Sequence, residues 1–499
     1  MTFTGSVIKK HEKKERLESN LNEHKRVRKE LIPPLAELNF KFSSWINERM
    51  PNMLWAILAS EFWPREKTLL FFRHVGRFVN DNKDCNDVTL TGVVKYTDEN
   101  KEHFIKHVVS WSRDTKDMLR PMMLFDMLPS RSNWEKHLEK AVPEKDWARL
   151  GDAILKALWH QSDEATDCRW VKVLCKMLGG KLHFAETMKE TPREFIEYPN
   201  YGDIQHARAM IRSIEISVGT RETEGELSWP EDFWKTCFEK TCCFPEKNRI
   251  VEKLDADIWS KQREHYVNET QSTRIAIINH FCDTCSNTGI NPRHEACFGF
   301  ALYAFTLFTD IIFYQLDYAL SGRLILRSLI ECLIVFRYLL DKDDIELWKS
   351  YRAYGIGQAK LIYLKQKEAG KVPESIELNE LENLVNEDQW LEFVPINLGN
   401  WDNTDLRKMS EEAGLKEIYD RYYNWTSGFV HGNWFAIRAS VFERCFNPLH
   451  RLHRLPTREL PMGNSITDDA LAIANMVFEL LSRAYPPFEE RIKITRVPL

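Results

Sequence analysis

The feature that most constrains the fold is a long apolar stretch in the C-terminal half, residues 298–340. Its spacing predicts two helices, 298–320 and 324–340, that form a hairpin around Ser321-Gly322. The second helix carries the signature Arg327-Ser-Leu-Ile-Glu331, and about a hundred residues later comes Ser427-Gly-Phe-Val-His431-Gly432. Each signature places polar side chains one helical turn apart. Because a core excludes Arg, Glu and His unless they are paired or functional, both signatures indicate a site or a structural ion pair.

The rest of the chain predicts a mainly α protein. Apolar residues recur with helical period in the N-terminal half, with a Pro near the start or a Gly at the end of several segments. The expected helices there contain residues 54–62, 69–79, 147–158, 171–178 and 204–218. Residues 219–249 are rich in Glu, Thr, Pro and Cys, so we expect an N-terminal helical domain over 1–250. A C-terminal up-and-down bundle should follow over 251–499, with further helices at 343–368, 411–430 and 468–483.

Two N-terminal segments depart from this pattern. Residues 88–96, rich in Val and Thr, predict a strand or a short hairpin. Residues 9–30 hold nine basic and five acidic side chains with almost no apolar face. They predict a solvated helix, with contact to a partner or to nucleic acid as the alternative.

Composition narrows the class of protein. A net charge of −5 argues against nonspecific coating of nucleic acid but allows a local basic cleft. Eleven scattered Cys and the lack of an apolar leader predict reduced thiols and a cytoplasmic location. Asp310 and Asp317 interrupt the run 298–320, so we expect a buried helix and no membrane partner.

The helix that carries Arg327 allows two interpretations. Arg323, Arg327 and Glu331 share one face, so Arg327 can pair with Glu331 along its own helix or with a group across the bundle. A buried Arg–Glu pair that fixes helix register is the structural interpretation. A guanidinium held in place for a phosphate is the functional one.

His431 is the candidate for proton transfer. As a structural residue it would complement the dipole at a helix C-terminus. A Ser427–His431 hydrolase is disfavoured because no orienting group or oxyanion hole accompanies the pair. Metal-independent RNA cleavage needs a base, an acid and a cation, and His431 with Arg421 or Arg327 supplies this set if the fold brings them together.

One cysteine cluster has the composition of a metal site. Cys282, Cys285, His294 and Cys297 follow the spacing Cys-x2-Cys-x8-His-x2-Cys, which provides four ligands that suit zinc. The second pair is closer than in most structural zinc sites, so we assign no metal and no cofactor. The trio Cys237, Cys242 and Cys243 shows no spacing typical of ligands.

The residues Gly322-Arg-Leu-Ile-Leu-Arg-Ser-Leu-Ile-Glu331, Tyr419-Asp-Arg-Tyr-Tyr423 and Ser427-Gly-Phe-Val-His-Gly432 together resemble a bacterial helical family known only as a domain of unknown function. The resemblance covers roughly residues 295–440. That family is loosely similar to HEPN domains, which are four- or five-helix bundles that often dimerise and that include RNases of toxin–antitoxin and anti-phage systems. In active HEPN RNases an Arg precedes the His by four to six intervening residues. Here Asn424 stands at the six-residue spacing, and nine residues separate Arg421 from His431.

The resemblance implies a HEPN-like C-terminal bundle in a bacterial defence or toxin-type protein that acts on RNA. His431, Arg421, Arg327 and Glu331 are then the candidate catalytic residues, and Ser427, Asn424 and Arg323 are candidates for substrate binding. The N-terminal half would bind a partner or sense a trigger, and the protein would form a homo-oligomer. The alternative is a non-catalytic interaction or scaffold protein in which the Arg–Glu and Ser–His groups are structural.

Overall fold

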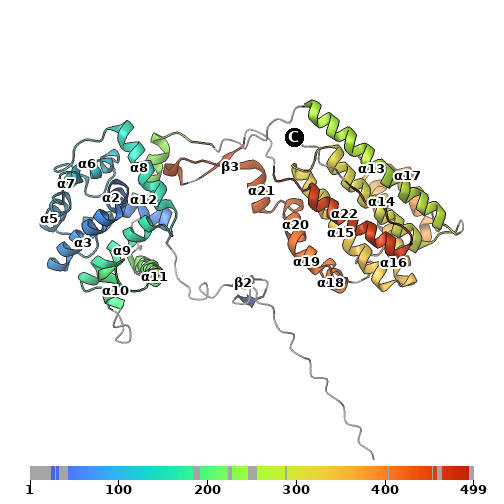
Figure 1. Ribbon diagram of the computed structural model, residues 1–499, viewed down its shortest axis with the longest axis horizontal. Coiled ribbons are helices and arrows are strands. Elements are labelled where there is room, and N and C mark those ends of the chain that lie inside the picture. Colours follow the sequence, from blue (N-terminus) through green and yellow to red (C-terminus); the bar gives the residue numbers. More distant parts are fainter. Residues whose placement is uncertain are drawn as a thin grey trace, which may run out of the picture. The chain divides into compact units, whose positions relative to one another are not determined.

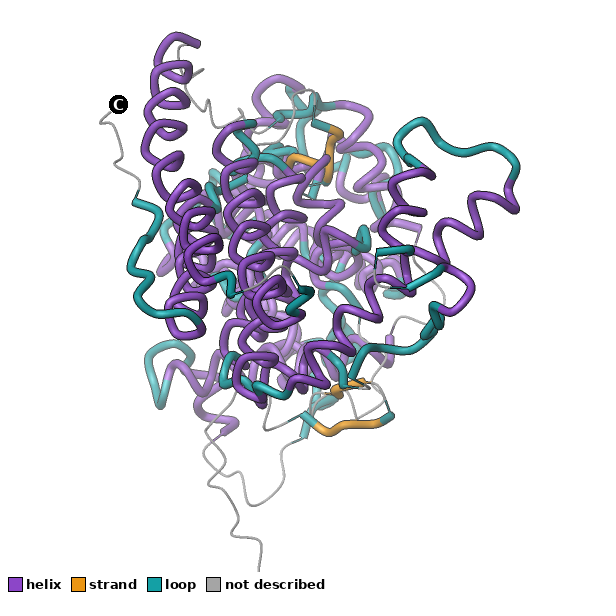
Figure 2. The backbone as a smooth tube through the Cα atoms, turned by 90° about the vertical axis from the view of Figure 1, so that its right-hand side faces the viewer, coloured by secondary structure: helices purple, strands orange, loops and turns teal. Residues whose placement is uncertain are grey.

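Helices make up most of the regular structure in this computed structural model, and the strands form two short hairpins, drawn in orange in Figure 2. The mainly α fold class is therefore confirmed. The structure describes residues 24–28, 30–32, 43–183, 191–222, 228–245, 256–286, 289–387, 389–402, 404–451, 453–457 and 463–493.

The chain divides into two units. Unit 1 comprises residues Met1–Phe244 together with Cys445–His453, and unit 2 comprises Pro245–Arg444 and Arg454–Leu499. A single boundary near residue 250 does not describe this division, because the segment Cys445–His453 returns to the N-terminal unit. We call these nine residues the return segment.

Unit 1 is a helical unit built around one aromatic-rich core, in which Trp55, Phe71, Phe72 and Trp170 are buried. The return segment belongs to this core through Leu449. The elements, labelled in Figure 1 where there is room, are β1 (Lys25–Val27), β2 (Glu30–Ile32), the π-helix η2 (Trp45–Arg49), α1 (Met50–Asn52), α2 (Leu54–Phe62), α3 (Arg65–Asp81), α4 (Leu90–Val94), α5 (Asp98–Val109), α6 (Thr115–Leu119), η3 (Arg120–Leu124), α7 (Arg131–Trp134), α8 (Pro143–Leu158), α9 (Asp163–Leu178), α10 (Thr191–Glu197), α11 (Ile204–Glu222), α12 (Ser228–Lys240) and η7 (Pro448–His450).

Unit 2 is a bundle of long helices that run side by side (Figure 1), and its core lies between α14, α15 and α22. Helices α13 and α16 pack against α14. The elements are α13 (Ala256–Thr284), α14 (Pro292–Phe313), α15 (Leu320–Lys342), α16 (Ile345–Ala369), α17 (Leu378–Val385), η5 (Leu391–Phe393), α18 (Leu406–Glu412), α19 (Lys416–Ile418), the π-helix η6 (Tyr419–Tyr423), α20 (Asn424–Val430), α21 (Trp434–Val441), β3 (Phe442–Arg444), β4 (Arg454–Pro456) and α22 (Thr467–Ala484).

Several predicted helices are confirmed, among them α3, α8, α9, α11, α16 and α22. Helix α9 shows why the sequence pattern succeeds. The Ser162 side chain accepts a hydrogen bond from the amide of Ala165 at 3.0 Å and caps the first turn. Gly179 follows the last turn, where it ends the helix as expected.

The predicted hairpin turn at Ser321-Gly322 is wrong by several residues. Helix α14 ends at Phe313, and both turn candidates lie inside the first turn of α15. The chain reverses over 314–319, where Gln315 takes a left-handed φ of 55°. Gly322 serves close packing instead, because a Cβ there would lie 2.0 Å from the carbonyl oxygen of Leu316.

The strand predicted over 88–96 is a helix, α4. The side chain of Thr89 accepts a hydrogen bond from the amide of Gly92 at 3.0 Å, which caps the first turn. Asp87 in turn accepts a hydrogen bond from the Thr89 hydroxyl at 2.8 Å. This local capping outweighs the β propensity of the Val and Thr residues, which depends on a neighbouring strand.

The single helix predicted over 411–430 is broken. Gly414 takes a φ of 68° after α18, and the amide of Leu415 donates to the carbonyl of Ser410 at 2.8 Å, so the first helix ends there. The chain then continues through α19 and the π-helix η6 into α20. The Tyr419–Tyr423 segment therefore lies in a separate helical element from α18.

Two further expectations concern the chain's ends and α14. Most of the charged segment 9–30 lies outside the described residues, and its described part contains strand β1 rather than a helix.

Helix α14 is long and apolar enough to cross a membrane by length and composition, which is weak support for a span. Its buried residues, such as Phe298 and Phe308, belong to the bundle core.

Gly322 offers a test of the hairpin. Replacing it with Ala should destabilise the protein by about 1–3 kcal/mol, because the added methyl meets the backbone of Leu316. Gly355→Ala is the matched control within helix α16, since nothing lies within 4 Å of its Cβ position, and it should stabilise by about 0.5–1 kcal/mol. Urea unfolding followed by circular dichroism measures both, and equal effects of the two substitutions would contradict the close packing.

Candidate functional site

Arg327 joins helix α15 to the π-helix η6. Its Nε donates to Glu331 Oε1 at 2.8 Å, and its Nη2 donates to the hydroxyl of Tyr423 at 2.5 Å. The guanidinium also lies over the Tyr423 ring, 4.2 Å from its centre. The Arg327 side chain is 14% exposed and that of Glu331 is 41% exposed. The pair is therefore a partly buried connection between two elements rather than a surface ion pair.

The π-helix η6 explains how Tyr423 reaches Arg327. Tyr419 and Tyr423 stack with their ring centres 4.5 Å apart, so two rings on the same side of η6 face α15. Burial raises the pKa of the Tyr423 hydroxyl. The hydroxyl thus stays protonated and accepts from Arg327 as a neutral group. The Nη1 atom of Arg327 is buried and makes no hydrogen bond with the described residues.

A pocket of about 460 Å³ lies beside this connection. It is formed by α14, α15 and α16, and Glu331 contributes to its wall. The other lining residues are mostly apolar or aromatic, with Ser328 as a further polar group; they are Ala296, Gly299, Phe300, Tyr303, Cys332, Val335 and Tyr351. The pocket has the size of a small-molecule site, but Glu331 is the only charged residue in its wall that could recognise a ligand.

The second signature forms a sharp corner between α20 and α21. His431 is the C-cap residue directly after α20, and Gly432 follows with a left-handed φ of 60°. The amide of Asn433 donates to the carbonyl of Gly428 at 2.9 Å, which is the six-to-one bond of a Schellman motif. A Cβ on Gly428 would lie 2.1 Å from the ring of Phe435, so α21 packs directly on the backbone of α20. Both glycines are thus required by the corner itself.

The corner exposes His431 together with aromatic and basic side chains. The imidazole makes no hydrogen bond or ion pair with the described residues, and Trp425, Trp434 and Arg438 are also exposed. A second pocket of about 340 Å³ lies between α20, α21 and the loop before α22, with Trp425 and Phe429 in its wall. We call the exposed part of residues 425–441 the corner surface.

The structure brings together some of the predicted site residues and separates others. Arg327 and Glu331 are joined, but neither contacts His431 through any bond found in the described part of the chain. Arg421 is exposed and donates to Glu417 on its own helical segment at 2.5 Å. His431 follows Arg421 by ten positions, which corresponds to about 15 Å along a helix axis.

The three predicted substrate-binding residues also differ in their placement. Asn424 is exposed at the start of α20, and Ser427 is half-buried one turn before His431. Arg323 is buried and donates to the carbonyls of Asp317 and Ala319 at 2.9 and 2.8 Å and to that of Asn464. Its guanidinium is therefore occupied in holding the α14–α15 turn, which leaves Asn424 and Ser427 as accessible candidates.

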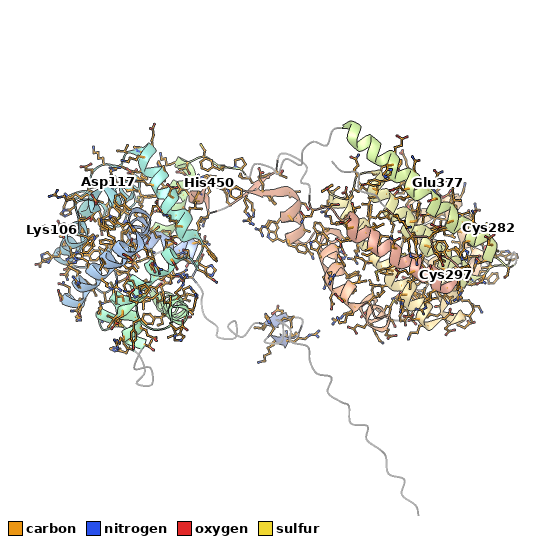
Figure 3. The ribbon with its side chains drawn as sticks, viewed as in Figure 1. Lys106, Asp117, Cys282, Cys297, Glu377 and His450 are labelled. Atoms are coloured by element: carbon orange, nitrogen blue, oxygen red, sulfur yellow. The ribbon has the colours of Figure 1, made fainter. Side chains whose placement is uncertain are left out.

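The structure does not assemble the zinc ligands considered over 282–297. Cys282, on α13, is exposed, whereas Cys297, on α14, is buried; Figure 3 labels both residues. His294 lies 2.9 Å from the Thr284 hydroxyl and packs among the rings of Phe281, Phe298 and Tyr485. Among the described residues, these four side chains do not form a cluster of metal-ligand geometry. His294 is a buried core histidine instead.

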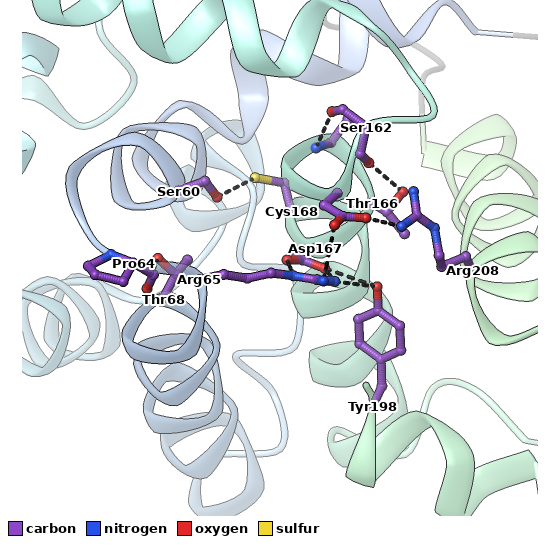
Figure 4. Close-up of polar contacts among 12 residues, drawn as sticks. Ser60, Pro64, Arg65, Thr68, Ser162, Thr166, Asp167, Cys168, Tyr198 and Arg208 are labelled. Carbon is purple, nitrogen blue, oxygen red and sulfur yellow. Dashed lines mark hydrogen bonds and ion pairs between the residues drawn. The ribbon is translucent and has the colours of Figure 1, made fainter. Parts of the chain in front are cut away.

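Unit 1 contains its own buried polar network, shown in Figure 4. Arg65 of α3 donates to both carboxylate oxygens of Asp167 on α9, at 2.7 and 3.0 Å, and the Tyr198 hydroxyl donates to the same carboxylate at 3.0 Å. Burial raises the pKa of Asp167, and Arg65 opposes this effect. Because every partner of the carboxylate comes from these helices and their neighbour, the network serves to join α3 to α9.

Sequence reasoning missed two exposed groups of the corner surface, Trp434 and Arg438. Both follow the His431-Gly432 signature directly, so an expected helix end at Gly432 could have drawn attention to the next helix. The missing information was exposure, which depends on how α21 packs on α20.

Residues 294–447 match a protein family of unknown function, DUF5677. No curated protein and no solved structure matches the chain. The matched part comprises 154 of the 499 residues and includes both signatures. It agrees with the resemblance of residues 295–440 to an uncharacterised helical family, while the relation to HEPN domains stays a prediction.

The role of Arg327 can be measured as stability. Arg327→Ala should lower the free energy of unfolding by about 1.5–3 kcal/mol, because it removes a charged hydrogen bond to Tyr423 in a partly buried place. Arg337→Ala is the matched control on the same helix, where Arg337 donates to Asp341 one turn away at 2.7 Å and its side chain is more exposed than that of Arg327, at 37%. It should cost less than about 0.5 kcal/mol. Equal losses in urea unfolding would show that the bond to Tyr423 contributes nothing.

Proposed function

We propose that unit 2 binds single-stranded RNA on the corner surface and cleaves it without a metal ion, with His431 as the proton-transfer group. The observation that supports this proposal most is the set of side chains that surround His431 in the sequence. An imidazole and a guanidinium that have no partner among the described residues occur with exposed Trp rings within seventeen residues of one helix–turn–helix corner.

The aromatic side chains suit unstacked bases. Proteins bind single-stranded RNA by stacking bases on aromatic rings and by placing cations along the backbone. Trp434 is 64% exposed and Trp425 borders the adjacent pocket, so a base can reach each of the two indole rings. Arg421 and Arg438 lie before and after the corner and supply positive charge for phosphates.

The chemistry follows from the imidazole. A neutral His431 would take the proton from a ribose 2′-hydroxyl, whose oxygen attacks the neighbouring phosphorus. The bond to the 5′-oxygen then breaks and that oxygen takes up a proton, which leaves a 2′,3′-cyclic phosphate and a 5′-hydroxyl. Arg438 would stabilise the charge on the phosphate. Arg327 and Glu331 have a positioning role in this scheme, because they hold the π-helix that leads into α20.

A non-catalytic interaction module is the second candidate. Val430, Phe435, Ile437 and Val441 are exposed on the same corner, and exposed apolar side chains in one place favour a protein partner. The Arg327–Glu331 pair is then purely structural. The two candidates differ in what Trp434 and His431 do for RNA.

RNA binding is tested by fluorescence anisotropy with a labelled single-stranded RNA and the full-length protein. Trp434→Ala should weaken binding about tenfold or more, the loss of one stacked base. Trp390→Ala is the control, because that residue is also exposed, at 73%, and also has one aromatic neighbour. Unchanged affinity in Trp434→Ala, or no RNA binding by the wild type, would favour the interaction module.

Cleavage is tested by incubating the protein with total RNA in the presence of a chelator. His431→Ala should abolish products that end in 2′,3′-cyclic phosphate, whereas His103→Ala, an exposed histidine on α5, should retain them. A toxin-type role further predicts that wild-type expression slows growth of a bacterial host and that His431→Ala relieves it. Cleavage that persists in His431→Ala would reject the assignment of this residue.

A further inference from the structure

Four potential metal ligands converge in unit 1. Cys243 follows α12, and Cys445, His450 and His453 lie in the return segment; Figure 3 labels His450. Their ligand atoms all lie within 4.8 Å of one another. We propose that these two thiols and two imidazoles bind a structural zinc ion.

The spacing of the ligand atoms fits a tetrahedral zinc site. Zinc–sulfur bonds of about 2.3 Å and zinc–nitrogen bonds of about 2.0–2.1 Å place neighbouring ligand atoms roughly 3.6 Å apart. The Cys243 sulfur lies 3.5 Å from His450 Nδ1 and 3.4 Å from His453 Nε2. The Cys445 sulfur lies 3.5 Å from His450 Nδ1. Three of the six separations between ligand atoms thus match those of a tetrahedral zinc site, and all six are within 4.8 Å.

Hydrogen bonds around His450 leave the correct nitrogen available. The hydroxyl of Thr241 donates to the carbonyl of Cys237 at 2.7 Å, so it accepts from His450 Nε2 at 3.0 Å. Nδ1 then carries the lone pair and faces the two sulfurs. Asn447 donates to the same hydroxyl at 3.0 Å and fixes its position. Such partners behind a ligand are typical of metal-binding histidines.

The surroundings of the Cys445 sulfur and of the two imidazoles also suit metal binding. The amide of Phe244 donates to the Cys445 sulfur at 3.3 Å, an interaction that favours a thiolate. The ring of Phe238 packs against both imidazoles, with ring centres 5.1 Å from His450 and 5.6 Å from His453. Cys445 and His450 are buried, so hydrogen bonds and packing hold two of the four ligands before any metal arrives.

The ligands occupy the points where the chain leaves and re-enters unit 1. Cys243 stands one residue before unit 1 first ends at Phe244, Cys445 is the first residue of the return segment, and His453 is its last. A closed site with four protein ligands has no open position for substrate, so its role is structural. One zinc ion would join segments about 200 residues apart in sequence, and long loops gain most from such a link.

Metal content is the direct test. The untagged full-length protein, produced in zinc-containing medium, should hold close to one zinc per chain by mass spectrometry of the dissolved metal. Cys243→Ser and His453→Ala should each reduce this content at least about fivefold. Cys242→Ser, which changes the exposed neighbouring cysteine, and Cys282→Ser should retain it. Zinc-free wild-type protein, or equal zinc in Cys242→Ser and Cys243→Ser, would reject the site.

Cobalt substitution keeps the test independent of misfolding. Apo protein titrated with Co²⁺ should give the intense visible absorption of a tetrahedral thiolate–imidazole site and lose it in Cys243→Ser. His453→Cys preserves a ligand, so it should still bind the metal with a spectrum shifted toward three sulfurs. Zinc removal should lower the melting temperature by about 5 °C or more. A Cys243–Cys445 disulfide with no metal in the freshly isolated protein would overturn the proposal.

Discussion

Unit 2 depends on the burial of helix α15. Its apolar face, which includes Leu326, Leu329, Ile330 and Leu333, packs into the core with α14 and α22. Arg327 lies at the edge of that face and carries the contact onward to Tyr423. Because α20 follows η6 without interruption, the packing of α15 also determines where the His431 corner stands. The candidate site is thus positioned by the core and not by a mobile loop.

Helical period was sufficient to predict the long helices, since apolar residues at a period of 3.6 have few other ways to be buried together. Helical period did not predict where the helices end, because glycine determines the backbone conformation there. Gly322 lies within a helix and permits close contact with Leu316, whereas Gly414 takes a left-handed φ and ends one. The residue type is the same in both places, and only the surrounding backbone distinguishes the two uses. The positions of the turns could therefore not be read from composition alone.

The candidate site shows the same division between local and distant information. The Arg327–Glu331 pair follows from spacing on one helix, but its partner Tyr423 lies 96 residues away and reaches it through a π-turn. Arg323 was expected to contact substrate, yet backbone carbonyls of the turn and of residue 464 occupy it. The cluster of Cys243 with the return segment was missed because Cys243 lies about 200 residues before its partners, a separation with no characteristic spacing.

The proposed zinc site lies partly inside and partly outside the residues that match the family of unknown function. The residues that match the family of unknown function are 294–447, so Cys445 falls within them, while Cys243, His450 and His453 fall outside. Zinc would therefore bind at the junction between the matched part and the rest of the molecule. Helix α21 leads through β3 directly into Cys445, and β4 leaves directly after His453. Holding these two residues on one ion would fix both ends of the segment that connects β3 to β4.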